Sequence, residues 1–208
     1  MPKRNPDPPK KIVSSIEKAE VVVMASSTGG PEILSRIFSI LPGTLKAPIL
    51  LVQHIPATMT GYFAKSLNQK SELDILEAAH GDEILPGKVY IAPGGRHMTV
   101  SKRDDQGRRT ILLNSRPLVN SVRPSADVLF ESVAESYSGR ILAVVLTGMG
   151  EDGKKGVADL KARNCFCITQ TSETCVVYGM PRAVDEAGLS DESLDPLDIT
   201  QKIVLMAQ

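Results

Sequence analysis

Short runs of aliphatic, mostly β-branched residues alternate along this chain with segments of helical periodicity, and this alternation constrains the fold more than any other feature. The run at 21–25 is typical of a buried parallel strand. The glycines and the proline that follow it suit the start of a helix, and apolar residues recur at helical spacing over 31–41. The unit then repeats, so we expect further strands at 48–53, 141–146 and 166–170, and further helices at 58–67, 153–162 and near 172–178.

Three more runs indicate strands, at 88–92, 98–102 and 110–114, and the polar turn between the last two predicts an antiparallel hairpin. A helix over 125–137 follows, with Ser125 in position to cap it. The pattern predicts an α/β fold: a doubly wound, mostly parallel sheet flanked by helices, with an antiparallel hairpin added. In such sheets ligands bind at the carboxyl ends of the strands, near the point where the strand order reverses.

Length and charge narrow the class of protein further. The 208 residues can bury a sizeable core, and 24 basic residues balance 24 acidic ones. That balance does not favour a nucleic-acid partner, because binding phosphates requires a basic surface. No aliphatic run is long enough to span a bilayer, and the basic N-terminus lacks the apolar stretch of a signal peptide. We therefore expect a cytoplasmic protein without direct membrane insertion.

Prolines among charged residues distinguish the beginning of the sequence from the rest. Proline fixes φ and removes a backbone donor, so we interpret residues 1–17 as an extended tail or the remnant of an interdomain linker. We expect residues 18–208 to form one folded domain.

Reactive side chains follow three of the expected strands. Ser27 comes just after the first strand, His54 ends the second unit's strand, and Asp152 lies in the loop after 141–146. Serine, histidine and aspartate on one edge of a sheet are the parts of a nucleophilic triad. The serine hydroxyl needs a base beside it, the imidazole can take and return that proton, and a buried carboxylate fixes the imidazole tautomer. The glycines after Ser27 would let backbone N–H groups approach a developing oxyanion.

Each of these residues also has a purely structural interpretation. The hydroxyl residues at 26–28 could cap the following helix, and Asp152 could cap the helix after it. His54, just before Ile55 and Pro56, could be a turn residue bonded to the backbone.

The Gly29-Gly30 loop has the strand–loop–helix context of a phosphate site. It lacks both the G-x-G-x-x-G pattern and the lysine of G-x-x-x-x-G-K-[ST]. The chain also lacks the G-x-S-x-G nucleophile elbow of ordinary α/β-hydrolases.

The cysteines and histidines do not form a recognised zinc spacing. Cys165 and Cys167 would point to the same side of a regular strand, most simply into the core. Cys175 is a conceivable nucleophile, but we interpret it as a buried structural thiol. We expect neither a metal nor a cofactor.

Six motifs in a fixed order are far more specific than any single loop. They are STGGP at 27–31, QHIP at 53–56, VYIAPGGRHM at 89–98, RPSADVLF at 123–130, LTGMGEDG at 146–153 and CVVYGMP at 175–181. Together they resemble the catalytic domain of the chemotaxis response-regulator protein-glutamate methylesterase family, from about residue 18 to the C-terminus. The resemblance implies that 18–208 is the methylesterase catalytic domain.

The resemblance also implies roles for five residues. Ser27 is the nucleophile, His54 the general base and then acid, and Asp152 the carboxylate that orients the histidine. The backbone N–H groups of Thr28 and Met149 are the oxyanion donors. The family's usual Gly-Ala before the nucleophile is Ala-Ser here, but the register of the following Thr-Gly-Gly selects Ser27 over its neighbour.

The activity that the resemblance implies is hydrolysis of glutamate methyl esters, with release of methanol. The substrate is the cytoplasmic helical region of methyl-accepting chemotaxis receptors, and many family members also deamidate receptor glutamines. Typical members carry a receiver domain, which is absent from this chain and is a further expected partner. Two other classes of function stay open: a catalytically silent module that docks on receptor helices, and a nucleotide-binding signalling domain built on Gly29-Gly30.

Overall fold

The computed structural model describes residues 17–208, so nearly all of the proline-rich segment lies outside the described residues. The main sheet has seven strands in the order β3-β4-β2-β1-β7-β8-β9, and every pairing is parallel. These strands are β1 (Val21–Ser26), β2 (Ile49–Gln53), β3 (Asp74–Glu77), β4 (Lys88–Ile91), β7 (Ile141–Val145), β8 (Cys165–Gln170) and β9 (Glu192–Leu194). The expected doubly wound parallel sheet is confirmed.

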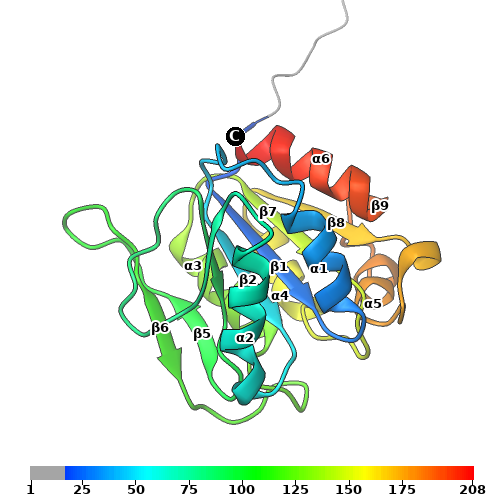
Figure 1. Ribbon diagram of the computed structural model, residues 1–208, viewed down its shortest axis with the longest axis horizontal. Coiled ribbons are helices and arrows are strands. Elements are labelled where there is room, and N and C mark those ends of the chain that lie inside the picture. The colour runs from blue at the N-terminus through cyan, green and yellow to red at the C-terminus, as the bar shows by residue number, and fades with distance from the viewer. Residues whose placement is uncertain (1–16) are drawn as a thin grey trace, which may run out of the picture.

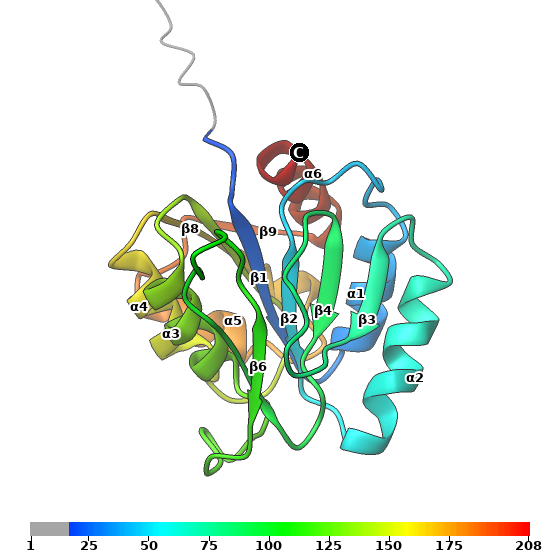
Figure 2. The same cartoon turned by 90° about the vertical axis from the view of Figure 1, so that its left-hand side faces the viewer.

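Helices cover both faces of this sheet (Figure 2). They are α1 (Gly30–Phe38), α2 (Ala57–Asn68), α3 (Ala126–Ser136), α4 (Lys154–Lys161), α5 (Met180–Glu186) and α6 (Pro196–Ala207). One core lies under α1, α2 and α6, and the other lies under α3, α4 and α5. Alternate residues of β1 enter opposite cores, Val22 the first and Val23 the second, which explains why the strand is apolar from residue 21 to residue 25.

The expected hairpin forms from β5 (His97–Val100) and β6 (Ile111–Asn114), which pair antiparallel. It is a separate two-stranded sheet rather than an extension of the main one, and Figure 1 shows it beside the main sheet. Met98, Val100 and Ile111 pack into the same core as α3. The hairpin therefore covers part of one face of the main sheet.

The prediction of a helix near 172–178 is wrong. Only a three-residue 3-10 turn, η1 (Ser172–Thr174), forms there, and the α-helix of this region is α5, which begins at Met180. Pro181 in the first turn of α5 suits a helix start, whereas the segment before it bends and makes an isolated bridge between Tyr178 and Gly148, in the loop after β7. Between residues 17 and 208, no helix combines the length and the apolar content needed to cross a bilayer.

The strand order reverses next to β1. The chain passes from β1 to β2 on one side and later places β7 on the other side of β1. Crevices for ligands in doubly wound sheets open at such a reversal, beyond the carboxyl ends of the strands. The loops after β1, β2 and β7 all meet there.

Candidate active site

Ser27 is the first residue after β1 and is half-buried, between a fully buried Ser26 and an exposed Thr28. None of these three side chains caps α1, whose N-cap residue is Gly29. Gly29 has φ of 84°, a left-handed conformation that favours glycine. The capping interpretation of the serines is therefore wrong, and the Ser27 hydroxyl is not engaged by the helix beside it.

A buried glutamine joins the loop of Ser27 to the loop of His54. Gln53, the last residue of β2, donates through Nε2 to the backbone oxygens of Ser27 (3.0 Å) and His54 (3.1 Å). Its Oε1 accepts a hydrogen bond of 2.6 Å from Ser26 Oγ. The Ser26 hydroxyl therefore fixes the orientation of the Gln53 amide, and the amide fixes two loops relative to each other.

The His54 ring contacts Asp152. Its Nε2 lies 2.9 Å from Asp152 Oδ2, although the two residues are 98 positions apart. An ionised carboxylate only accepts hydrogen bonds, so Nε2 is the donor, and in the neutral imidazole the lone pair is on Nδ1. No hydrogen bond among residues 17–208 engages Nδ1, which leaves it available as a base.

Asp152 is 2% exposed and accepts hydrogen bonds on both oxygens. Oδ2 accepts from the His54 ring and from Ala126 N, and Oδ1 accepts from Ser125 Oγ, Asn120 Nδ2 and Asp127 N. Burial by itself raises the pKa of the Asp152 carboxyl, but these hydrogen bonds outweigh burial and hold the pKa below its ordinary value. The carboxylate is thus ionised and fixed in orientation at neutral pH.

The expectation that Asp152 caps the helix after it is wrong. Asp152 does not cap α4, the helix that follows it, whose N-cap residue is Gly153. It caps α3 instead, because the N–H groups of Ala126 and Asp127 point at it. Ser125, the expected cap of α3, makes no capping hydrogen bond and gives its hydroxyl to Asp152.

Asp127 completes a reciprocal arrangement. This residue of the first turn of α3 accepts from the N–H groups of Gly153 and Gly156 at the start of α4. Burial raises the pKa of the Asp127 carboxyl, the hydrogen bonds lower it in part, and the charge of Asp152 raises it again. Each of two neighbouring helices is therefore capped by a carboxylate from the other helix or its leading loop.

The two backbone amides expected to bind an oxyanion have no acceptor among the described residues. Thr28 N and Met149 N lie in the loops after β1 and β7, and Met149 is 70% exposed. Thr147 ties these loops together, because its Oγ1 donates to Thr28 O (2.9 Å) and accepts from Val177 N (3.0 Å). Two free N–H groups on a fixed edge can stabilise a negative charge that develops between them.

Within residues 17–208 no hydrogen bond joins Ser27 Oγ to the His54 ring. The backbones of the two loops are nonetheless adjacent, since His54 N donates to Ser26 O (3.0 Å). Gly148 packs closely against Ser27, because a Cβ at residue 148 would lie 2.8 Å from Ser27 Cβ and closer still to Met180 Sδ. Nucleophile–base hydrogen bonds are often loose without a substrate and tighten when it binds.

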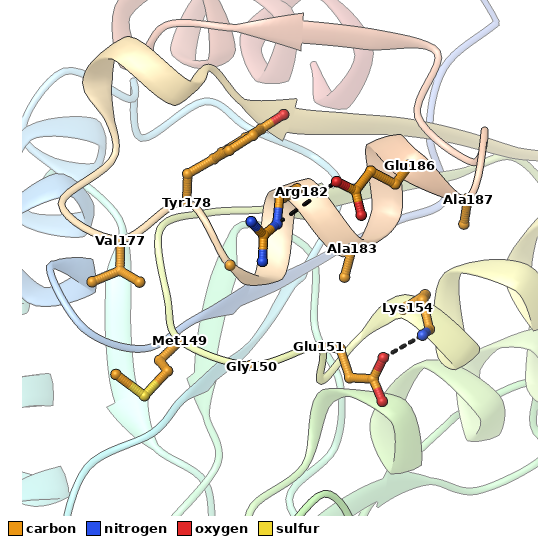
Figure 3. Close-up of a pocket in the computed structure, with 11 residues that line it drawn as sticks. Met149, Gly150, Glu151, Lys154, Val177, Tyr178, Arg182, Ala183, Glu186 and Ala187 are labelled. Atoms are coloured by element: carbon orange, nitrogen blue, oxygen red, sulfur yellow. Dashed lines mark hydrogen bonds and ion pairs between the residues drawn. The ribbon is translucent and has the colours of Figure 1, made fainter.

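Two hollows flank these residues. The larger, about 770 Å³, lies beside Met149 and is bordered by two ion pairs, Arg182 with Glu186 at 3.8 Å and Lys154 with Glu151 (Figure 3). The smaller, about 380 Å³, lies beside His54 and is lined in part by Ile55, Leu118 and Val122. The hollow on the β7 side thus has acidic and basic side chains around it, whereas the hollow on the β2 side combines apolar side chains with Arg123.

Among the described residues, no cysteine hydrogen-bonds to Ser27, His54 or Asp152. Cys167 is buried and Cys165 packs against the same core, as expected from their spacing. Cys175 is half-buried rather than buried, and burial raises the pKa of its thiol to about 11. In the part of the chain that the structure describes, no three metal-ligating side chains gather in one place.

A parallel α/β fold that gathers serine, histidine and aspartate at its strand reversal defines a class, the α/β proteins with a hydrolase-type constellation. The comparisons with known proteins narrow the class. The family model described as CheB methylesterase matches residues 22–203. The chain belongs to the CheB methylesterase family.

Individual relatives and a solved structure support this family assignment. A protein-glutamate methylesterase/protein-glutamine glutaminase of Desulfotalea psychrophila is 46% identical over 90% of this chain and 51% of its own length. One with the same name from Pyrococcus abyssi is 41% identical over 95% of this chain and 53% of its own. The CheB methylesterase catalytic domain of Thermotoga maritima superposes with a TM-score of 0.86 at 41% identity, covering 90% of this chain and 98% of that one. The chain spans about half the length of the curated relatives it matches.

Sequence reasoning missed the residues that hold the constellation in place. Gln53, Asn120 and the Ser125 hydroxyl bond across segments far apart in the sequence, so no local periodicity reveals them. A signal did exist for Gln53, a polar residue that ends a wholly apolar strand. Such a side chain is buried only with partners for its amide.

Proposed function

We propose that this chain is the catalytic part of a protein-glutamate methylesterase that also deamidates glutamine. The proposed substrate is the cytoplasmic helical region of methyl-accepting chemotaxis receptors, and the proposed place of action is the cytoplasm. A receiver domain is the proposed second partner. The observation that carries the proposal is the 2.9 Å contact of His54 with Asp152 beside Ser27, at the reversal of strand order, in a chain of this family.

In the proposed first half-reaction, Ser27 Oγ attacks the carbonyl carbon of a glutamate methyl ester. His54 Nδ1 takes the hydroxyl proton, and Asp152 stabilises the resulting imidazolium through Nε2. The carbonyl oxygen becomes an oxyanion, which the N–H groups of Thr28 and Met149 stabilise. The C–O bond to the methoxy group then breaks, His54 returns its proton, and methanol leaves behind an acyl-enzyme.

In the second half-reaction a water molecule attacks the acyl-enzyme and gives a proton to His54. The tetrahedral intermediate collapses, the proton passes to Ser27 Oγ, and the glutamate carboxylate is released. A glutamine amide follows the same path with ammonia as the leaving group. One site therefore suffices for both activities that the relatives' names contain.

The test is methanol release from a methylated receptor. Ser27→Ala should lower the rate by about 10⁴- to 10⁶-fold while the thermal midpoint stays close to that of the parent protein. Ser26→Ala is the matched control, since it removes the neighbouring hydroxyl but no nucleophile and should cost roughly tenfold or less. Near-normal turnover by Ser27→Ala would refute the assignment, and clear receptor binding without any turnover by the parent protein would favour a silent docking module.

A further inference from the structure

Asn120 contacts the proposed catalytic carboxylate from a turn over residues 119–122 that gives it no other side-chain donor. The segment between β6 and α3 makes a tight turn, in which Val119 and Val122 exchange backbone hydrogen bonds of 3.1 and 3.0 Å. The two central residues, Asn120 and Ser121, have φ of 51° and 63°. Positive φ at both central positions is the geometry of a type I′ turn, and asparagine tolerates it better than most residues.

The Asn120 side chain bridges two carboxylates. Its Nδ2 donates to Asp127 Oδ2 at 2.7 Å and to Asp152 Oδ1 at 2.9 Å. Both acids are buried, 8% and 2% exposed, so their negative charges face each other with little water between them. An amide that donates one hydrogen to each reduces this repulsion and fixes the rotation of both carboxylates.

The same turn forms a wall of the hollow beside His54. Leu118 precedes Asn120 and is 58% exposed, and with Val122 it lines the 380 Å³ hollow that the His54 ring also lines. The segment is anchored at both ends: Pro117 O accepts from His97 Nε2, and Arg123 O accepts from Gly95 N at 2.9 Å. The Asn120 side chain therefore joins the turn that lines the hollow beside His54 to the carboxylate of Asp152.

We propose that Asn120 is a positioning residue for the reaction: it orients Asp152 against His54 and couples that orientation to the turn that walls the hollow beside His54. The inference rests on the proposed function, because it assigns Asp152 the role of orienting the base. Asn120 does not touch the reacting atoms in this arrangement. Its effect on the reaction passes through the orientation of Asp152, which Asn120 contacts directly and holds also through Asp127.

Glycine provides the cleanest substitution. Asn120→Gly keeps the left-handed backbone and removes only the amide, and Ser121→Gly is a matched control at the next residue with the same conformation. With Asn120→Gly we expect kcat for methanol release to fall about 10- to 100-fold with KM within roughly twofold, as for a lost hydrogen bond to a charged group. Asn120→Asp, of equal size, should cost more, because it sets a third carboxylate beside Asp127 and Asp152.

An NMR titration of the His54 ring supplies a readout that does not depend on turnover. The chain has only three histidines, and His54→Gln assigns the resonance. Removing a donor leaves more negative charge on Asp152 for the imidazolium, so the His54 ring should titrate at a higher pH in Asn120→Gly than in the parent protein. The acid limb of the kcat profile should move the same way, and Ser121→Gly should move neither.

Several outcomes would overturn the inference. Unchanged kcat and an unchanged His54 titration in Asn120→Gly would do so, as would equal effects in Ser121→Gly. A lower kcat with an unshifted titration would show that the effect bypasses Asp152. If Asn120→Gly does not fold, Ser125→Ala removes the other side-chain donor to Asp152 Oδ1 and should shift the titration upward too. If the parent protein releases no methanol, the proposed function fails, and the titration still decides the role of Asn120.

Discussion

At the scale of single residues, Gln53 shows how stability and catalysis can be separated. Its amide holds the carbonyls of Ser27 and His54, and Ser26 holds the amide. Gln53→Leu should lower the free energy of unfolding by about 2 kcal/mol, because it leaves the buried Ser26 hydroxyl and the His54 carbonyl without partners. It should also lower kcat roughly tenfold, since the two loops lose their connection. Urea unfolding and methanol release measure the two effects.

The double variant Ser26→Ala/Gln53→Leu is the decisive comparison. It replaces both buried partners by apolar groups, a change that is often close to neutral for stability. We expect it to regain most of the lost unfolding free energy but none of the lost activity. Recovery of activity together with stability would mean that Gln53 acts on the fold alone.

The reactive residues of the site could be predicted from the sequence, but the residues that hold them in place could not. Ser27, His54 and Asp152 stand out because each reactive type directly follows a run that reads as a strand. The partners of Asp152 could not be predicted, because they come from a turn and from the start of a helix, 25 to 32 positions away. Only the folded chain brings these donors to one carboxylate.

At the scale of elements, the junction of β1 and α1 depends on Gly29. Its φ of 84° costs a non-glycine residue about 1–2 kcal/mol, and a Cβ there would lie 2.6 Å from the Val176 side chain. Gly29→Ala should therefore destabilise the protein and displace the adjacent Thr28 amide, lowering kcat by at least about tenfold. Thermal unfolding and the methanol assay test both effects.

Gly107 supplies the control for that substitution. It lies in the turn between β5 and β6 with φ of 81°, and a Cβ there would meet nothing within 4 Å. Gly107→Ala imposes the same backbone strain without the overlap and away from Thr28. A similar loss of kcat in both variants would mean that general destabilisation, not displacement of the amide, lowers the activity.

Elements with a strong local pattern could be predicted from sequence, and elements that depend on their neighbours could not. The central strands β1, β2 and β7 are buried on both faces, so their apolar runs are unmistakable. The edge strands β3 and β9 are short and partly exposed, and their sequences carry no clear run. The helix α6 was missed although Asp195 caps it and Pro196 opens it, both recognisable start signals.

At the scale of the whole molecule, three separate segments converge on Asp152, which lies in the loop after β7. The loop after β2, the turn at Asn120 and the start of α3 all donate to this carboxylate. The hydrogen bonds make the folded-state pKa of Asp152 lower than the unfolded value, despite burial. As the pH falls, the unfolded chain therefore binds this proton first. The stability that Asp152 supplies is complete above the ordinary value of 3.8 and is lost as the pH falls through the lower, folded value.

Asp127 has the opposite linkage. Burial raises its pKa in the folded chain, so folding favours the protonated form and ionisation costs stability as the pH rises through the interval between the two values. Asp152→Asn should lower the free energy of unfolding by on the order of 3 kcal/mol at pH 7, and this deficit should shrink as the pH falls below the ordinary aspartate pKa. The deficit of Asp127→Asn should instead shrink as the pH rises. Denaturant unfolding at pH 3, 5 and 7, pH values chosen to span roughly the titration range of carboxyls, separates the two, and parallel trends in both variants would contradict the linkage.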